Sequence, residues 1–334
     1  MPRHFVVLAT YARADDVKVL LGDLAAQTRP PDEVVVVDDT PDGSVEAVAK
    51  AFDGLPVTFL RPGGRPSLTR ARNLAREHLL AAGDDDEDLV TFFDSDVRIE
   101  PDHLEQLAAL TRRRPGALGY MGWVADYPRG TWWKNRATAL LGISSATRRR
   151  CRLHLPIRVQ YPVQRPRGDQ AVDWLYGCNM TVPRRTLAAV SFDGAMERYG
   201  YGEDLDFSLR ARATLGGTFW MTGEAVLRHG MTDDGRLPPL DVFRMRLAHR
   251  AVLTHRHAGG RGGGNVGRLG PLRAFKLWWG GIGNVLYYSQ LYPERASDYR
   301  NVYRQVRRVL RRRRADVRAG RVEAFNDLYT FLQR

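Results

Sequence analysis

The first third of the chain alternates short apolar runs with segments whose apolar residues recur every three to four positions. Runs rich in β-branched and aromatic residues predict buried strands at residues 4–9, 33–37, 57–60 and 89–93. Helical spacing predicts helices at residues 15–27, 45–52, 67–80 and 101–110. Ser67 stands at the N-cap position of the third helix. This alternation is typical of an α/β fold with a mostly parallel sheet flanked by helices.

Polar residues follow three of these strands where each strand is expected to end. They are Thr10-Tyr11, Asp38-Asp39 and Asp94-Ser95-Asp96. Open α/β sheets bind their ligands beyond the carboxyl ends of the strands. The sequence therefore predicts a polar ligand site at this edge of the sheet.

The pattern is weaker after residue 110. Residues 126–170 are rich in Arg, Pro and Trp without a clear period, and they predict loops and short elements. Regular structure is expected again at residues 172–182, in a helix beginning near Glu203 and in a strand at 218–221.

The charge of the chain divides it into two parts. Residues 1–230 hold 30 basic and 30 acidic residues, whereas residues 231–334 hold 21 basic and 8 acidic ones, which accounts for the formal net charge of +13. We therefore expect a neutral catalytic domain at 1–230 and a basic, mainly helical extension at 231–334. The glycine-rich run at 259–264 is the best candidate for a hinge.

Several features favour a cytoplasmic protein. No run reaches the roughly 18 apolar residues of a membrane span, and the N-terminus lacks the pattern of a signal peptide. Cys151 and Cys178 suit a reducing compartment better than a disulfide framework, and we interpret both as packing residues.

Asp94 and Asp96 are the strongest candidates for a metal site. Two carboxylates two residues apart, directly after a buried strand, can share a divalent cation. Mg²⁺ and Mn²⁺ are commonly held by one or two carboxylates together with substrate phosphates. His229, which follows a short apolar run, carries an imidazole that suits Mn²⁺-class metals and becomes relevant beside such a pair.

A second acidic cluster, Gly202-Glu203-Asp204-Leu205-Asp206, opens a predicted helix. One interpretation is an acidic first turn that complements the helix dipole. The other is a general base that takes a proton from an acceptor hydroxyl. The helix N-terminus would keep such a carboxylate ionised.

Together these segments resemble the family 2 glycosyltransferases, inverting enzymes of the GT-A fold. The resemblance covers residues 4–230 and rests on segments that occur in this order: Thr10-Tyr11, VVVVDD (34–39), TRARN (69–73), FFDSD (92–96), GCNM (177–180), GEDLDFSLR (202–210) and His229.

The resemblance implies a role for each matching residue. Asp204 would be the catalytic base, and Glu203 would support it. Asp94, Asp96 and His229 would hold Mn²⁺ or Mg²⁺. The nucleotide-sugar donor would bind among Thr10, Tyr11, Asp39 or Asp38, Arg72, Asp94, Ser95 and Asn179. The acceptor, which is a glycan, a lipid-linked molecule or a small metabolite, stays undetermined, as does the oligomeric state.

The sequence departs from the family pattern at two points. The acidic strand end continues as DDTPDGS instead of DDGS or DDNS, and the Q-x-x-R-W motif of processive members is absent. A single transfer of a sugar, from a UDP- or dTDP-linked donor, is therefore favoured over polymerisation.

Two other classes of protein share single features of this sequence. A nucleic-acid-binding protein would explain the basic charge, but the body is neutral and carries no such motif, so we expect no nucleic-acid partner. A GT-A-like nucleotidyltransferase would need a glycine-rich basic loop after the first strand, and ATYARADD lacks one.

The arginine-rich helix at 299–314 has two interpretations. Its apolar residues, Val302, Val306, Val309 and Leu310, could pack on the protein and leave a solvated basic face. Alternatively, the helix could lie on an anionic membrane as a basic amphipathic helix does, with Trp278, Trp279, Tyr287 and Tyr288 as anchors or as core residues.

Overall fold

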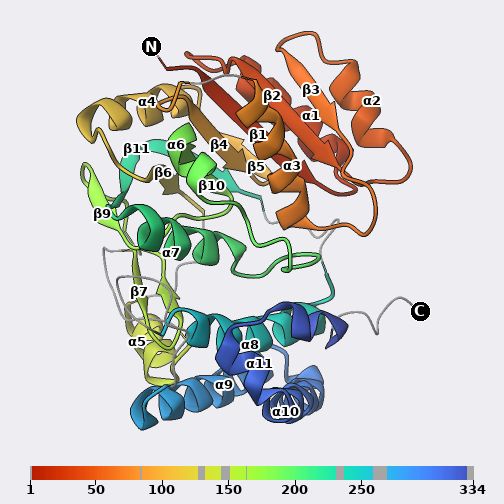
Figure 1. Cartoon of the computed structure of the whole chain (residues 1–334), viewed down its shortest axis with the longest axis vertical. Coiled ribbons are helices and arrows are strands. Elements are labelled where there is room, and N and C mark those ends of the chain that lie inside the picture. The colour runs from red at the N-terminus through yellow and green to blue at the C-terminus, as the bar shows by residue number, and fades with distance from the viewer. Residues whose placement is uncertain are drawn as a thin grey trace. The chain divides into compact units, whose positions relative to one another are not determined.

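The computed structural model describes residues 2–82, 85–126, 132–143, 151–162, 164–230, 237–258 and 269–328. The chain forms two compact units (Figure 1). The first comprises residues 1–128 and 165–236, and the second comprises 129–164 and 237–334. The expected hinge at 259–264 lies outside the described residues.

The first unit is built on a mixed sheet with helices on its faces (Figure 1). In spatial order its strands are β3 (Val57–Leu60), β2 (Glu33–Asp38), β1 (His4–Thr10), β4 (Leu89–Phe93), β10 (Asn179–Pro183), β6 (Gly119–Val124), β11 (Phe219–His229) and β5 (Val97–Ile99). A further strand, β9 (Gln170–Val172), pairs with the start of β11.

The sheet is mostly parallel, as the sequence predicted. Strands β1 to β4 run parallel, and β11 runs parallel to β6. Strand β10 is antiparallel to both β4 and β6, so it reverses the direction at the centre of the sheet. The carboxyl ends of β1, β2 and β4 consequently meet at one edge, where their polar residues follow.

The expected helices of this unit are all present. They are α1 (Ala14–Ala25), α2 (Ser44–Lys50), α3 (Leu68–Ala81), α4 (His103–Arg113) and α7 (Glu203–Leu215). The side chain of Ser67 accepts a hydrogen bond from the backbone N–H of Arg70, which confirms the predicted N-cap. A short helix, α6 (Arg184–Ala189), was not predicted.

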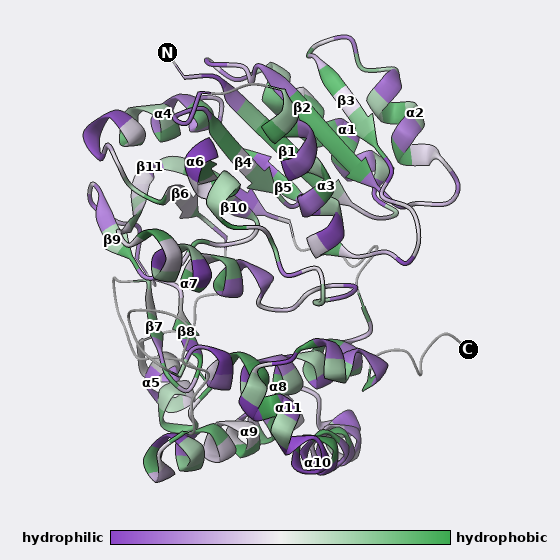
Figure 2. Ribbon diagram, in the orientation of Figure 1, coloured by the Kyte–Doolittle hydropathy of each residue, from purple (hydrophilic) through white to green (hydrophobic). Residues whose placement is uncertain are grey.

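The core explains why the strands form where they do. Val34–Val37 are fully buried, and the apolar strands β1, β2 and β4 stand out in Figure 2. Strand β6 escaped prediction because two glycines interrupt its apolar pattern. A Cβ at Gly122 would collide with the carbonyl oxygen of Ala225 on β11, so this glycine permits the close approach of two strands.

The second unit is mainly helical. It contains α5 (Trp132–Leu140), the hairpin of β7 (Arg152–His154) and β8 (Arg158–Gln160), α8 (Pro239–Arg256), α9 (Pro271–Leu291), α10 (Ala296–Arg312), α11 (Arg314–Ala319) and the 3₁₀ helices η1 (Pro293–Arg295) and η2 (Glu323–Leu328). Phe243 of α8 stacks edge-on with Tyr288 and Tyr299, which forms the centre of this unit. None of the described helices is long and apolar enough to cross a membrane.

Candidate active site and metal centre

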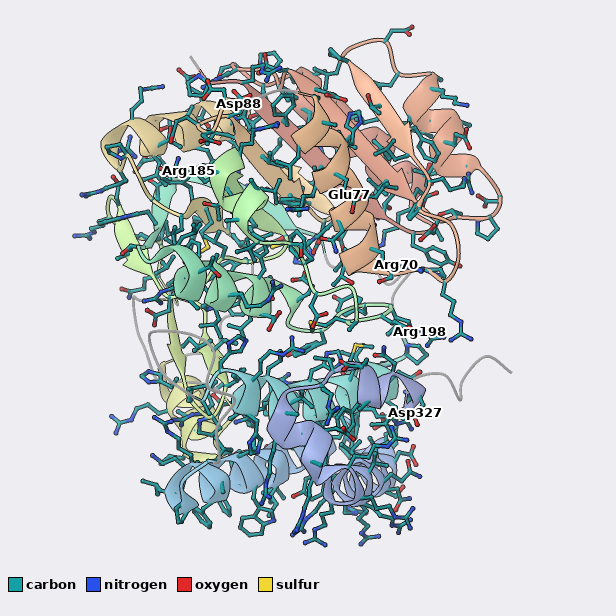
Figure 3. The ribbon with its side chains drawn as sticks, viewed as in Figure 1. Arg70, Glu77, Asp88, Arg185, Arg198 and Asp327 are labelled. Carbon is teal, nitrogen blue, oxygen red and sulfur yellow. The ribbon has the colours of Figure 1, made fainter. Side chains whose placement is uncertain are left out.

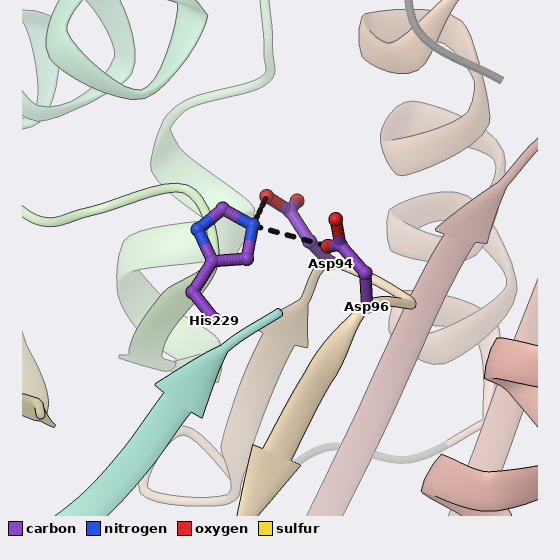
Figure 4. Close-up of side chains that lie close together, drawn as sticks. All are labelled: Asp94, Asp96 and His229. Carbon is purple, nitrogen blue, oxygen red and sulfur yellow. Dashed lines mark hydrogen bonds and ion pairs between the residues drawn. The ribbon is translucent and has the colours of Figure 1, made fainter. Parts of the chain in front are cut away.

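The two aspartates and the histidine meet at the edge of the sheet (Figure 4). Asp94 and Asp96 follow β4, and His229 is the last residue of β11. Antiparallel pairing sets His229 opposite Val97, and the backbone N–H of Gly230 donates to the carbonyl of Asp96 at 2.8 Å. The short strand β5 therefore positions the histidine beside the D-x-D segment.

The distances within this cluster are suited to a shared cation. His229 Nε2 lies 3.0 Å from Asp96 Oδ1 and 3.6 Å from Asp94 Oδ2. The three potential ligand atoms lie within 4.8 Å of one another. Two carboxylates and an imidazole form a donor set that fits Mn²⁺ or Mg²⁺.

Asp96 is the electrostatic centre of the cluster. Its side chain is 1% exposed, and Arg13 Nη1 lies 2.9 Å from its Oδ2. Burial opposes ionisation, but the hydrogen bond and charge of His229, together with the charge of Arg13, hold the pKa of Asp96 well below its ordinary value. Asp96 is therefore a firmly ionised carboxylate.

Arg13 was missed by the sequence analysis. It lies in the loop after β1, three residues beyond Thr10, and directly precedes α1. Its position at a strand end was the available signal, but nothing distinguished it from the other basic residues. Ala12 before it adopts a left-handed φ of 54°, and its N–H donates to Thr40 Oγ1 at 2.6 Å. This strained turn orients the arginine.

A buried arginine lies behind the metal cluster. Arg72 of α3 is 1% exposed, and its Nη1 donates to Glu203 Oε1 at 2.5 Å. Its Nη2 donates to the carbonyl oxygen of Gly177 at 2.8 Å and lies 3.4 Å from Asp94 Oδ1. Burial raises the pKa of Glu203 well above its usual value, while the charge of Arg72 acts in the opposite direction. Arg72 thus links the metal cluster to the start of α7.

Asp204 stands at the N-terminus of α7, half-buried beside this arginine. Its Oδ2 accepts the N–H of Gly177 at 2.9 Å, and its Oδ1 accepts the N–H of Leu205 at 2.7 Å. The backbone N–H groups do favour the charged form, as expected. Burial nevertheless outweighs them and raises the pKa of Asp204 to about 6.

Burial is thus a second influence on this carboxylate, beside the helix N-terminus that the sequence indicated. At pH 7 a group with a pKa of about 6 is still roughly 90% ionised. A base is most effective when its pKa lies near the working pH. The pKa of Asp204 therefore suits this carboxylate to the role of proton acceptor.

Gly177 ties these groups together. Its carbonyl oxygen accepts from Arg72, and its backbone N–H donates to Asp204. A Cβ at Gly177 would lie 3.0 Å from Glu203 Oε1 and 3.3 Å from Arg72 Nη1. Only glycine fits at this position without displacing the Arg72–Glu203 pair.

The sequence profile of the family described as glycosyl transferase family 2 matches residues 5–170, about half of the chain. The chain belongs to glycosyl transferase family 2. The matched range includes Asp94 and Asp96 but ends before Asp204 and His229. Site roles for Asp204 and His229 are therefore supported by the geometry and not by the family match. No curated protein matches the chain.

Solved structures share the fold of this glycosyltransferase. A mannosyltransferase from Pyrobaculum calidifontis, in complex with GDP-Man and Mn²⁺, is similar with a TM-score of 0.53 and 17% identity, over 100% of this chain and 88% of that chain. TarS from S. aureus has a TM-score of 0.48 and 16% identity, and the match covers 98% of this chain and 55% of TarS. Glucosyl-3-phosphoglycerate synthase from Mycobacterium tuberculosis, in complex with Mg²⁺ and UDP, has a TM-score of 0.46 and 18% identity over 77% of each chain.

The remaining predicted residues of the glycosyltransferase differ in their exposure. Thr10 Oγ1 donates to Ser95 Oγ at 3.2 Å, and Ser95 is buried. Tyr11 is 40% exposed at the same strand end. Asn179 is fully buried at the start of β10, opposite Phe93 of β4, so its side chain does not reach the surface.

The two aspartates after β2 also differ. Asp38 is buried and accepts both the N–H and the hydroxyl of Thr40, at 3.0 and 2.6 Å. Asp39 is half-buried and accepts the N–H of Gly63 at 3.1 Å. Burial raises the pKa of both carboxyls. Asp38 stabilises its own loop, which leaves Asp39 as the more accessible of the two.

The cysteines offer no competing chemistry. Cys151 and Cys178 are both free and buried. Burial raises the pKa of the Cys178 thiol well above its usual value, so the thiolate that a nucleophile requires is disfavoured. Both residues serve packing, as the sequence indicated.

Proposed function

We propose that this chain is an inverting, metal-dependent glycosyltransferase that transfers one sugar from a UDP- or dTDP-linked donor to an acceptor hydroxyl. The observation that carries the proposal is the Asp94–Asp96–His229 cluster joined through Arg72 and Gly177 to Asp204. Metal ligands and a base lie within one hydrogen-bonded assembly, as a single displacement requires.

Three residues around the start of α7 would act on the acceptor. Asp204, ionised at neutral pH, would take the proton of the acceptor hydroxyl as its oxygen attacks the anomeric carbon. Glu203 and Arg72 would fix the Gly177 peptide and so orient that carboxylate. Attack by the acceptor from the side opposite the leaving diphosphate would invert the configuration of the sugar.

Asp94, Asp96 and His229 would hold Mn²⁺ or Mg²⁺, which supplies a positive charge that stabilises the leaving diphosphate. Arg13, paired with Asp96 at 2.9 Å, would add a further cation beside the diphosphate. The complexes of the related mannosyltransferase with Mn²⁺ and of the synthase with Mg²⁺ support this assignment.

The donor would lie along the strand ends. Thr10, Tyr11 and Ser95 would line the nucleotide pocket, with Asp39 accepting the N3–H of uracil or thymine. Asn179, being buried, would act by shaping the pocket wall from behind. The complex of the synthase with UDP supports a uridine donor, whereas the complex of the mannosyltransferase with GDP-Man makes guanosine the alternative to test.

Two further features of the proposal rest on the sequence. Transfer of a single sugar is supported by the missing Q-x-x-R-W motif. A cytoplasmic location is supported by two buried cysteines that remain unbridged.

Thermal denaturation tests the proposal directly. We expect UDP or dTDP to raise the melting temperature of the wild type when Mn²⁺ is present, and GDP to do so less. Asp96→Ala should keep its fold but lose most of the metal-dependent shift, because it removes the buried ligand. Asp102→Ala, which changes an aspartate outside the site, is the matched control. An unchanged metal-dependent shift in Asp96→Ala would remove the central claim, and NMR coupling constants of the product would report whether the configuration inverts.

A further inference from the structure

Helix α9 of the second unit carries large apolar side chains on its surface. They include Leu272 at 65%, Phe275 at 55% and Leu286 at 51%, and Trp278 and Trp279 are 40% and 37% exposed. Residues 271–276 are exposed throughout. Scattered apolar residues are ordinary on a protein surface, but a contiguous apolar helix face marks an interaction site.

The packing of α9 explains this exposure. The helix contacts its neighbours through Gly280, Gly281 and Gly283, which are buried. A Cβ at Gly283 would collide with the carbonyl oxygen of Leu141, and one at Gly281 would lie 2.9 Å from the ring of Tyr303. Because the glycine segment makes the close contacts, the bulky residues of the first half of the helix are left on the outside.

The neighbouring helix α10 is amphipathic, and its apolar side is already occupied. Tyr299, Val302 and Val306 are buried, and α10 packs against α8 and α9. The burial of these residues supports the interpretation of a packing stripe, and contact of the helix with an anionic membrane stays a prediction. The arginine side of the helix remains on the surface, where nitrogen-tipped side chains project outward around α10 (Figure 3).

The arginines of α10 border the apolar face of α9. The guanidinium of Arg307 lies 6.0 Å from the centre of the Trp278 ring. Gly281 faces Tyr303 and Trp278 faces Arg307, so the two helices run antiparallel, and Arg311, one turn beyond Arg307, follows toward the end of α9 that carries Phe275. Within the described part of the chain, no carboxylate pairs with Arg307 or Arg311. Arg313, by contrast, pairs with Asp327.

We propose that Leu272, Phe275, Trp278, Arg307 and Arg311, here named the α9–α10 face, dock on the surface of an anionic lipid bilayer. Exposed Trp and Phe favour the boundary between headgroups and acyl chains, and aliphatic side chains gain by entering it. Arginines at the rim of such a face would contact lipid phosphates. The second unit would thereby hold the enzyme at a membrane without spanning it.

Charge decides between a bilayer and other occupants of this face. A second copy of the chain would bring two arginine rows against each other, which like-charge repulsion opposes. A nucleic acid would match the arginines and could stack on Trp278, but it would leave Leu272 and Leu286 without a favourable environment. An anionic bilayer satisfies both the charged and the aliphatic parts.

Co-sedimentation with vesicles tests this inference on the full chain, independently of catalysis. The vesicles contain one part phosphatidylglycerol to three parts phosphatidylcholine, with pure phosphatidylcholine as the neutral arm, at about 50 mM salt. We expect the charge variant Arg307→Gln/Arg311→Gln to bind anionic vesicles roughly 25-fold more weakly, because each arginine contributes about fivefold. The apolar variant Leu272→Ser/Phe275→Ser should lose at least about tenfold on both kinds of vesicle.

Matched controls remove the same charge or the same apolar groups elsewhere on the surface. Lys18→Gln/Arg112→Gln and Val19→Ser/Leu215→Ser change exposed residues of the first unit and should stay within about twofold of the wild type. Melting curves verify that each variant folds. The inference fails if the wild type ignores anionic vesicles, or if the controls lose as much binding as the test variants. It also fails if random duplex DNA binds the wild type equally well and the apolar variant changes neither interaction.

Discussion

Replacing Asp204 by Asn tests the assignment of the catalytic base. The substitution keeps the shape of the side chain but removes its ability to take a proton. A positioned general base contributes about 10² to 10⁴ in rate, so kcat should fall by that factor. Nucleotide affinity should change little, because Asp204 contacts Gly177 and Leu205 and not the metal cluster.

The fold should tolerate this change. Burial raises the pKa of Asp204 from 3.8 to about 6, which corresponds to about 3 kcal/mol spent on keeping the charge buried. Asn removes that cost, but it also loses one hydrogen bond to a charged acceptor, worth about 1.5–3 kcal/mol. The two terms nearly cancel. A large loss of activity with an unchanged melting temperature would therefore reflect chemistry and not unfolding.

The pH dependence provides a second readout. Because the base must be ionised, kcat of the wild type should rise tenfold per pH unit up to about pH 6 and then level off. Asp204→Asn should lack this limb, with a low and flat residual rate. Asp206→Asn is the matched control in the same helix, and its effect on kcat should be much smaller.

Stability should vary with pH in the opposite sense. The folded protein binds the Asp204 proton more tightly than the unfolded chain, so this group contributes stability that is present below pH 3.8 and lost as the pH rises through about 6. Relative to the wild type, Asp204→Asn should therefore gain about 1 kcal/mol in unfolding free energy between pH 5 and pH 8. A near-normal kcat in Asp204→Asn, or the same acidic limb in that variant, would refute the assignment.

The network behind Asp204 can be tested in the same assays. Arg72→Lys cannot donate to Glu203, Asp94 and Gly177 together, which leaves a buried carboxylate poorly paired. Urea unfolding should therefore show a free energy of unfolding about 3 kcal/mol lower than that of the wild type. An unchanged free energy of unfolding would show that the fork geometry is unimportant. Gly177→Ala places a methyl group 3.0 Å from Glu203 Oε1, so kcat should fall about tenfold or more with nucleotide affinity retained; an unaltered kcat would mean that the peptide does not orient the base.

Local sequence patterns were sufficient for the first four strands of the first unit and the helices between them. Apolar runs and helical spacing predicted β1 to β4 and their helices closely, because parallel strands buried on both faces require near-continuous apolar sequence. The same reasoning failed for β6, where Gly119 and Gly122 serve the close approach of neighbouring strands. Such contacts are long-range and leave no periodic signal.

In the candidate site, too, local features could be predicted from the sequence and long-range contacts could not. The D-x-D pair, a short apolar strand before it and an isolated histidine could be recognised from the sequence, and β5 then brings them together. The role of Arg72 could not be predicted, because its partners lie 22, 105 and 131 residues away. The resemblance had placed Arg72 toward the nucleotide, whereas its side chain is 1% exposed and turned into the protein.

The charges of the site support an order of binding in which the metal ion precedes the nucleotide diphosphate. Its carboxylates are Asp94, Asp96, Glu203 and Asp204, and its guanidinium groups are Arg13 and Arg72. Carboxylates outnumber guanidinium groups, so a bare diphosphate would meet a net negative field. A divalent cation at the exposed side of Asp94 would offset this excess of negative charge without disturbing the buried Arg72 pair, since Asp94 is 32% exposed and Glu203 only 6%. The arrangement that would make nucleotide binding depend on the metal would therefore also keep the proposed base and its supporting arginine in place before any substrate arrives.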